Sequence, residues 1–300
     1  MNYYIRFAGE APQIWKIDET TAVRLGVSNP EQGPGCYFRA AESETIWDTI
    51  RRSTPWFEPT GENPFHKIIR GPGEYYPRIW RPSDQHPYDV PSWGPTTRAE
   101  RDLIAMSRGQ LTALTGQLEQ ICRTVHPCSA TLDTFGHEIR NLLILASTEV
   151  EGHWRGILTA NGFTKDRYST HDYVLLQRAM RLSEYAVSFD SYPWLQSFSP
   201  FQGWGSTGRP TSELEWYDAY NAVKHNREAE FRRARLEHVF EALSAIVIMA
   251  TAQFGFAPAI GSELRGFFRL SKYPKFPLAD IYIYPYDAQN GEWIPVPYTF

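Results

Sequence analysis

The sequence predicts a mainly α-helical protein, with four to five helices in a bundle and a small β-rich layer formed by the N- and C-terminal segments. The first observation is where the prolines lie: residues 1–96 hold 12 of the 22, residues 258–300 hold 6, and the middle holds 4. Because proline breaks helix interiors, the middle of the chain is predicted to be helical. The second observation is the helical spacing of apolar residues in that middle part.

These observations divide the chain into three predicted segments. Residues 1–96 form a mixed α/β segment rich in proline and aromatic residues, residues 97–257 form the helical bundle, and residues 258–300 form a tail that packs on the N-terminal segment. With 300 residues, 42% of them apolar and 15% aromatic, the chain can bury a sizeable core.

Short elements are predicted in the N-terminal segment: strands at Asn2–Phe7, Ile14–Ile17 and Cys36–Arg39, and a helix at Ser43–Arg52. In the tail, strands at Ile281–Tyr284 and Trp293–Val296 flank an Asn290-Gly291 turn, which is typical of a hairpin. Nearby prolines place these strands at a sheet edge. We expect the two ends of the chain to share one β layer, and no strand between residues 97 and 187.

Four helices are predicted in the middle part, at Thr97–Thr124, Thr131–Ala160, His171–Val187 and from Ser212 to about Ala252. Asn161-Gly162 ends the second helix, since glycine readily takes the left-handed conformation after a helix C-terminus. Ser212 and Glu215 have the S-x-x-E spacing of a capping box, so they start the fourth helix, which then contains a break or kink.

Composition excludes several classes of protein. A net charge of −4 argues against binding nucleic acid through a broad basic surface, so any such contact is local. The three cysteines form no C-x-x-C pair, which supports neither a disulfide framework nor a zinc ribbon. No signal peptide or membrane span is evident, because the longest apolar stretch, Ala242–Thr251, is short. We expect a cytoplasmic protein that does not enter a membrane.

The segment Glu215–Arg227, EWYDAYNAVKHNR, carries the strongest indication of a site. Positions 221, 224 and 225 share one helix face, so an amide, an amine and an imidazole converge there, as proton transfer or phosphate binding requires. The alternative is structural, with the basic side chains paired outward to nearby glutamates. The candidate catalytic residues are Asn221, Lys224, His225, Arg227, Arg233 and His238.

Two carboxylates on the second helix, Glu149 and Glu151, are the candidate partners of this segment. Glu149 lies at the border of the buried stripe, where a carboxylate is costly unless a cation meets it. We therefore expect Glu149 to pair with the Lys224–Arg227 cluster, and Glu151 to be solvated. A single metal on Glu149, His153 and His225 is the alternative, but a surface pair beside a packed histidine is favoured, and no metal or cofactor is expected.

The loop of residues 189–211 is rich in aromatic residues, glycine and serine, and it leads into the fourth helix. Loops of this length commonly cover a site or bind a partner. The loop contains a G-x-G-x-x-G sequence, but no strand is predicted before it and no helix directly after it, as a dinucleotide site requires. The loop is therefore a candidate lid, protein-binding surface or cover of a small-ligand pocket.

From about residue 97 to 255 the chain resembles the HEPN superfamily of four- to five-helix bundles. The resemblance rests on a long helix pair, on N-x-x-K-H-x-R at Asn221–Arg227, and on RRARLEH, in which Arg232 and Arg233 precede His238 at the family's Arg-to-His spacing. Many prokaryotic members are metal-independent ribonucleases of toxin and defence systems, and members form dimers. The resemblance therefore implies RNA as partner and self-association as a homodimer.

If RNA is the substrate, the resemblance implies cleavage at a 2′-hydroxyl. His225 or His238 would then move the proton, and Arg227 or Arg233 would stabilise charge on the phosphate. RNA binding without cleavage is the weaker form of this hypothesis. The competing hypothesis is a non-catalytic interaction module that binds a protein or a small ligand through the 189–211 loop.

Overall fold

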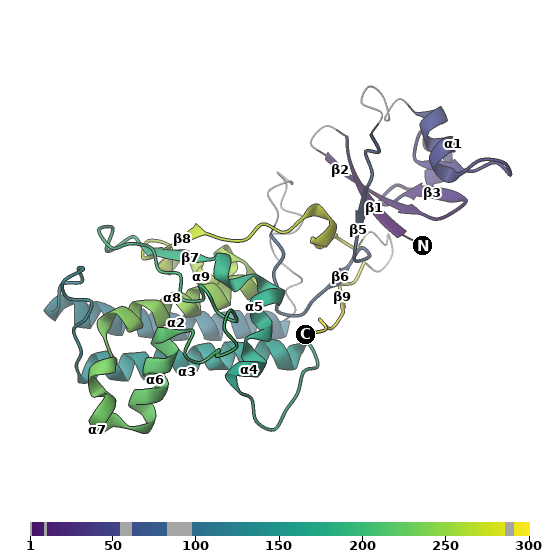
Figure 1. Ribbon diagram of the computed structural model, residues 1–300. Helices are drawn as coiled ribbons and strands as arrows, with labels where there is room; N and C mark the ends of the chain where they lie inside the picture. The colour runs from purple at the N-terminus through teal and green to yellow at the C-terminus, as the bar shows by residue number, and fades with distance from the viewer. Residues whose placement is uncertain (1, 9–10, 55–61, 83–97, 286–290) are drawn as a thin grey trace. The chain divides into compact units, whose positions relative to one another are not determined.

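The computed structural model describes residues 2–8, 11–54, 62–82, 98–285 and 291–300. Contacts divide the described residues into two units (Figure 1). The N-terminal unit takes its residues from 1–75, 81–92 and 275–296. The helical unit takes its residues from 76–80, 93–274 and 297–300. Both units therefore combine segments that are far apart in the sequence.

The N-terminal unit contains a five-stranded antiparallel sheet in the order β4-β3-β2-β1-β5. Strands β1, β2 and β4 confirm the predicted strands, α1 confirms the predicted helix, and β3 and β5 were not predicted. Thr45 caps α1 through a capping box with Asp48. The elements are β1 (Asn2–Ala8), β2 (Ala11–Ile17), β3 (Thr21–Arg24), η1 (Pro30–Gln32), β4 (Tyr37–Arg39), α1 (Ile46–Ser53) and β5 (His66–Ile68).

Both faces of this sheet are covered by apolar side chains, because neighbouring strand residues point to opposite faces. Trp15 belongs to a cluster with Ile50 of α1, whereas the adjacent Ile14 belongs to a second cluster with Ile5. Leu278 and Ile281, from the C-terminal part of the chain, complete the second cluster. A segment far away in the sequence thus covers one face of the N-terminal sheet.

The C-terminal residues of this unit are held by pairing and by charge rather than by the predicted hairpin. β9 (Ile294–Pro295) pairs in parallel with β6 (Glu74–Tyr75), and Ile281–Tyr284 is not a strand. The predicted turn includes Asn290, which lies outside the described residues. Asp280 is the last residue of the short helix η5 (Leu278–Asp280), and its carboxylate forms ion pairs with Arg70 at 2.6 Å and Arg81 at 3.4 Å.

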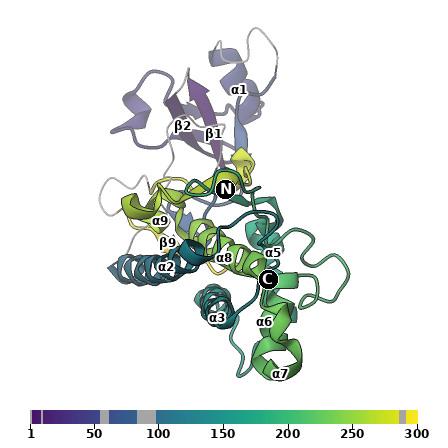
Figure 2. The same cartoon turned by 90° about the vertical axis from the view of Figure 1, so that its left-hand side faces the viewer.

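The helical unit is built on α2 and α3, which lie side by side, with α8 packed against both (Figures 1 and 2). β7 pairs with β8. Its elements are α2 (Arg98–Thr124), α3 (His137–Ala160), α4 (Thr170–Tyr173), α5 (Leu175–Met180), η3 (Leu182–Glu184), β7 (Ala186–Phe189), α6 (Glu215–His225), α7 (Arg227–Glu230), η4 (Phe231–Arg233), α8 (Leu236–Phe254), α9 (Phe256–Leu264) and β8 (Phe268–Lys272).

A helix-rich protein with a small antiparallel sheet is thus confirmed. A bundle of four to five helices is not clearly formed, because helices in this unit range from 4 to 27 residues. Helix α2 agrees with the prediction, and α3 ends as predicted, with Gly162 at a φ of 80°. The predicted 171–187 helix is wrong, since Arg181 takes a φ of 53° between α5 and η3, and β7 starts inside the range predicted to lack strands.

Helix α8 is the core of the helical unit and contacts α2, α3, α6 and α9. By length and composition it could cross a membrane, but 89% of the apolar window is buried inside the protein. An apolar helix enclosed on all sides is what the core of a large domain requires. The apolar run at 242–252 is therefore buried and offers no exposed face for self-association. Self-association stays a prediction without that support.

The 189–211 loop packs its rings into the protein. Phe198, Phe201 and Trp204 are buried, and Trp204 stacks on Trp154 of α3 with ring centroids 5.0 Å apart. Trp194 is the exception, with 54% of its surface exposed and its indole stacked on His126. This loop therefore covers the core, and a protein-binding role for it would depend on Trp194.

Candidate functional site

The predicted long helix is interrupted at Asn226, in the middle of the candidate cluster. Helix α6 ends at His225, and Asn226 leaves helical geometry with a φ of −137° and a ψ of 73°. Its side chain then accepts from the Ala229 N–H and caps α7. Ser212 and Glu215 form no capping box, because the residue before α6 is Leu214. Arg227 therefore does not continue the face that carries Lys224.

Asn221 and Lys224 are both engaged locally instead of converging with His225. The Asn221 amide donates to the Tyr217 carbonyl at 3.1 Å, one turn earlier in α6. Lys224 Nζ donates to the Tyr220 hydroxyl at 2.6 Å and lies 4.8 Å from the centre of the same ring. The hydrogen bond to Tyr220 raises the pKa of Lys224, which stays a cation. The predicted convergence of these three side chains is therefore not formed.

Glu151, not Glu149, meets α6. The hydroxyl of the buried Tyr217 donates to Glu151 Oε1 at 2.6 Å. Burial, followed by Glu151, raises the pKa of the Tyr217 phenol. Two positions along a helix are about 200° apart around its axis, so Glu149 and Glu151 point in different directions. The predicted pairing of Glu149 with Lys224, His225 or Arg227 is corrected by this geometry.

Because Glu151 is the carboxylate that contacts α6, its removal should destabilise the protein more than removal of Glu149. Glu151→Ala leaves the buried Tyr217 hydroxyl without its acceptor, so we expect the free energy of unfolding to fall by about 2 kcal/mol. Glu149→Ala should cost under about 1 kcal/mol, because burial raises the pKa of Glu149 and its charge is poorly compensated. Urea unfolding followed by circular dichroism measures both. Equal losses, or a larger loss for Glu149→Ala, would contradict the assignment.

The Arg-to-His pattern of RRARLEH does not form an accessible catalytic pair. His238 is buried, and its Nδ1 donates to the Arg233 carbonyl at 2.8 Å while its Nε2 accepts from Arg235 at 2.9 Å. Burial and then Arg235 lower the pKa of His238 to about 4, so it is neutral at pH 7. The Arg233 guanidinium pairs with Asp218. Both His238 and Arg233 thus have structural partners.

Glu149 belongs to a buried polar network that spans three helices and the 76–80 segment. Its carboxylate lies 3.6 Å from His153 Nε2, and the same nitrogen lies 3.3 Å from Ser107 Oγ. On its other side His153 Nδ1 accepts from Gln253 Nε2 at 2.9 Å. Arg78 Nε donates to Gln253 Oε1 at 2.7 Å. Arg78, Ser107 and Gln253 were not predicted to take part in a site.

The orientation of Gln253 fixes the tautomer of His153. Its amide nitrogen donates to the Met249 carbonyl at 2.7 Å as well as to His153 Nδ1, so a flipped amide would face that carbonyl with its oxygen. Burial and then Arg78 lower the pKa of His153 to about 3, so its single proton lies on Nε2. A serine nucleophile needs an unprotonated nitrogen there. Ser107 and His153 are therefore not arranged as a nucleophile and its base.

Arg78 enters this network in a conformation that non-glycine residues seldom adopt, with a φ of 57°. Its guanidinium packs on Gly156, where a Cβ atom would lie 2.1 Å from Nη1. One sequence signal for the network was present: Gln253 is a polar residue directly after the apolar run at 242–252 of α8. Nothing in the sequence distinguishes Arg78 from the other arginines.

Glu149, His153 and His225 do not come together as a metal site. Across the described ranges, no three His, Cys, Asp or Glu side chains stand close enough to hold a metal ion together. His153 uses both ring nitrogens within the network, and His225 is exposed at the end of α6. The alternative of a surface pair of Glu149 and His153 beside a packed His225 is also wrong, because His153 is buried and His225 is exposed.

Exposed rings and cations gather where α3 begins and α6 ends. We call Phe135, His137, Phe231 and Arg232 the ring platform. Phe231 lies 5.8 Å from Phe135 and 4.9 Å from His137 between ring centroids, and the Arg232 guanidinium lies 5.9 Å from the Phe135 ring. Phe135 is 42% exposed. The platform combines stacking surfaces with a cation.

The ring platform borders the end of α6 and a cavity. Arg140, in the first turn of α3, donates to the Val223 carbonyl at 3.3 Å, which holds the end of α6 beside α3. Lys224, His225 and Arg227 are exposed there. A cavity of about 420 Å³ opens between the last turns of α2 and the Thr134–Ile139 segment, with Phe135 and His137 in its wall.

Comparison of the chain with protein-family models, curated proteins and solved structures finds no match. The function is therefore argued from the chemistry of these side chains and their arrangement.

Proposed function

We propose that the helical unit binds single-stranded RNA across the ring platform and the exposed end of α6. The observation that supports it most is the Arg232 guanidinium over the exposed Phe135 ring, with Phe231 and His137 beside it. Single-stranded nucleic acids are bound by exposed rings that stack on bases, combined with cations that contact phosphates. Lys224, His225 and Arg227 would supply the phosphate contacts.

The charge of this surface favours a local contact of moderate affinity. Glu138 and Glu228 are exposed among the basic side chains, and the whole chain carries a net charge of −4. A strand would therefore bind through a few nucleotides, with stacking contributing more than bulk electrostatics. We expect a dissociation constant in the micromolar range at low salt.

The same proposal assigns proton transfer, in a cleavage reaction, to His225 rather than His238. His225 is exposed beside Lys224 and Arg227, whereas His238 is buried with both nitrogens engaged. A base must reach the 2′-hydroxyl of its substrate within hydrogen-bond distance. Cleavage that survives His225→Ala would remove this assignment without affecting the binding proposal.

Binding is tested with a fluorescein-labelled 12-nucleotide RNA in EDTA, followed by anisotropy. We expect the double variant Phe135→Ala, Arg232→Ala to bind about tenfold more weakly, because loss of one stacking contact costs about 1–3 kcal/mol. Arg101→Gln is the matched control, since Arg101 is exposed near the opposite end of α2. An unchanged affinity of the double variant, or no binding by the native protein, would refute the proposal.

A protein-binding role for the 189–211 loop is the competing proposal. Trp194 is the residue that supports it, because Phe198, Phe201 and Trp204 are buried. Trp194 is itself tied down, since its indole N–H donates to the Pro127 carbonyl at 2.6 Å. The ring platform offers the larger set of exposed groups.

A further inference from the structure

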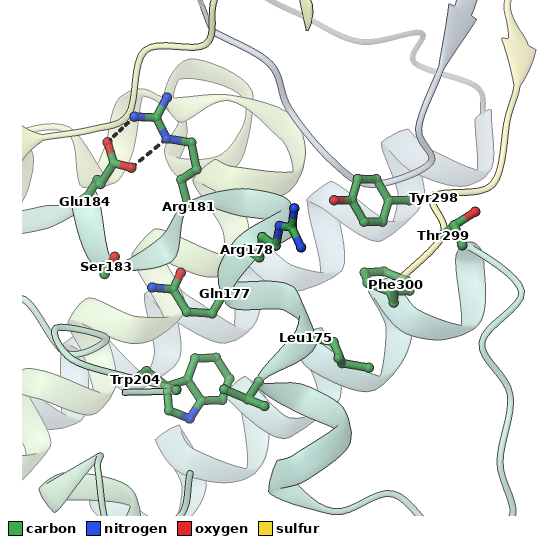
Figure 3. A pocket seen from close by; sticks show the side chains of 12 residues that line it. Leu175, Gln177, Arg178, Arg181, Ser183, Glu184, Trp204, Tyr298, Thr299 and Phe300 are labelled. Carbon is green, nitrogen blue, oxygen red and sulfur yellow. Dashed lines mark hydrogen bonds and ion pairs between the residues drawn. The ribbon is translucent and has the colours of Figure 1, made fainter. Parts of the chain in front are cut away.

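A second cavity of the helical unit, which we call the α5 pocket, has a volume of about 730 Å³. It is lined by α5, by η3, by Trp204 and Gly205 of the 189–211 loop, and by Tyr298, Thr299 and Phe300 (Figure 3). Its volume lies in the range of small-molecule sites. No residue of the ring platform lines it, so its ligand is independent of RNA binding.

The α5 pocket carries one uncompensated positive charge. Arg181 and Glu184 neutralise each other through two contacts of 2.6 Å, Nε to Oε1 and Nη2 to Oε2 (Figure 3). Arg178 has neither a hydrogen bond nor an ion pair with any other described residue. In Figure 3 its guanidinium faces the space in front of Tyr298 and Phe300. An anionic group of a ligand would complete this arrangement.

The remaining wall is apolar and aromatic. Leu175, Tyr298 and Phe300 line it, and the last two rings lie 5.0 Å apart between centroids, tilted by 52°. All three side chains are partly exposed, so their surfaces are accessible from the cavity. Rings in this arrangement suit a planar aromatic body better than a flexible chain.

We propose that the α5 pocket binds a small planar aromatic carboxylate. The carboxylate pairs with Arg178, and the ring packs against Tyr298 and Phe300. A carboxylate is preferred to a phosphate monoester, because one arginine balances one negative charge. A dianion would leave excess negative charge near Glu184.

Isothermal titration calorimetry of the full chain with indole-3-carboxylate tests this proposal. We expect saturable one-site binding with a dissociation constant below about 1 mM. Indole lacks the carboxylate, so it should bind at least about tenfold more weakly. Arg178→Gln should weaken binding of the acid by at least about tenfold, and Arg101→Gln should leave it unchanged.

Far-ultraviolet circular dichroism checks that each variant keeps its helices. The proposal is overturned if the acid shows no saturable binding, if Arg178→Gln binds it as tightly as the native protein, or if indoxyl phosphate binds more tightly than the acid.

Discussion

Gln253→Leu is expected to lower the free energy of unfolding by about 3 kcal/mol, because three buried groups lose their partner at once. Arg78 Nε loses its acceptor, His153 Nδ1 loses its donor, and the Met249 carbonyl loses a hydrogen bond. Leucine has a similar volume, so little of the loss comes from a cavity. The effect therefore measures the polar network itself.

Urea unfolding followed at the helical circular dichroism band measures this loss. Gln110→Leu on the exposed face of α2 is the matched control, and its effect should stay within about 0.5 kcal/mol of zero. The slopes of the two unfolding curves should agree, which shows that the native and unfolded states expose similar surface. A loss below about 1 kcal/mol for Gln253→Leu would mean that the network contributes little to stability.

Acidification from pH 7 to pH 5 is expected to lower the protein's free energy of unfolding by about 2 kcal/mol for each of the two buried histidines. In the folded protein the pKa of His153 is lowered to about 3 and that of His238 to about 4, from an ordinary value of 6.5. The unfolded chain therefore binds more protons below pH 6.5, and stability falls as the pH falls. The loss continues until the pH reaches each folded-state pKa.

Burial sets the sign of this loss, and charged neighbours change its size. Arg78 faces His153, and Arg235 faces His238, so protonation would place two cations together. Glu241 on α8 acts in the opposite direction, because burial and then Glu237 raise its pKa to about 7. Its protonation between pH 7 and 4.5 favours the folded state, so the whole protein should lose less than the two histidines together.

Single variants separate these contributions. His153→Gln should reduce the stability difference between pH 7 and pH 5 by about 2 kcal/mol, whatever it costs at pH 7. His171→Gln, at the exposed start of α4, should leave that difference unchanged. If His153→Gln keeps the full difference, His153 is protonated in the folded protein and the hydrogen bond from Gln253 is not formed as described.

Secondary structure was predicted best where local chemistry decides it. Strands β1 and β2 follow from short segments rich in isoleucine and aromatic residues, and α2 follows from a long helical repeat without proline. The end of α3 at Gly162 follows from the left-handed backbone that glycine tolerates. The prediction was wrong at Arg181, where a non-glycine residue takes the same conformation and ends α5. Propensity gives no sign of such a residue.

The candidate site was predicted less well than the fold. The sequence located Glu149 and Glu151 on one helix and the Lys224 cluster on another, and these helices do pack together. It assigned the contact to the wrong carboxylate, because the buried stripe of α3 is wide enough to turn either one toward α6. The ring platform was not predicted, since Phe135 and Phe231 are almost 100 residues apart in the sequence.

The sequence by itself determined where α1, α2, α3 and strands β1, β2 and β4 lie, that the core is helical, and which polar residues lie near apolar faces. Those properties depend on residues within a few positions of one another. Only the tertiary structure decided which polar groups meet. Arg78 reaches Gln253 across 175 positions, and Gln253 reaches His153 across 100. Such contacts depend on the packing of whole helices, and no local pattern of residues encodes them.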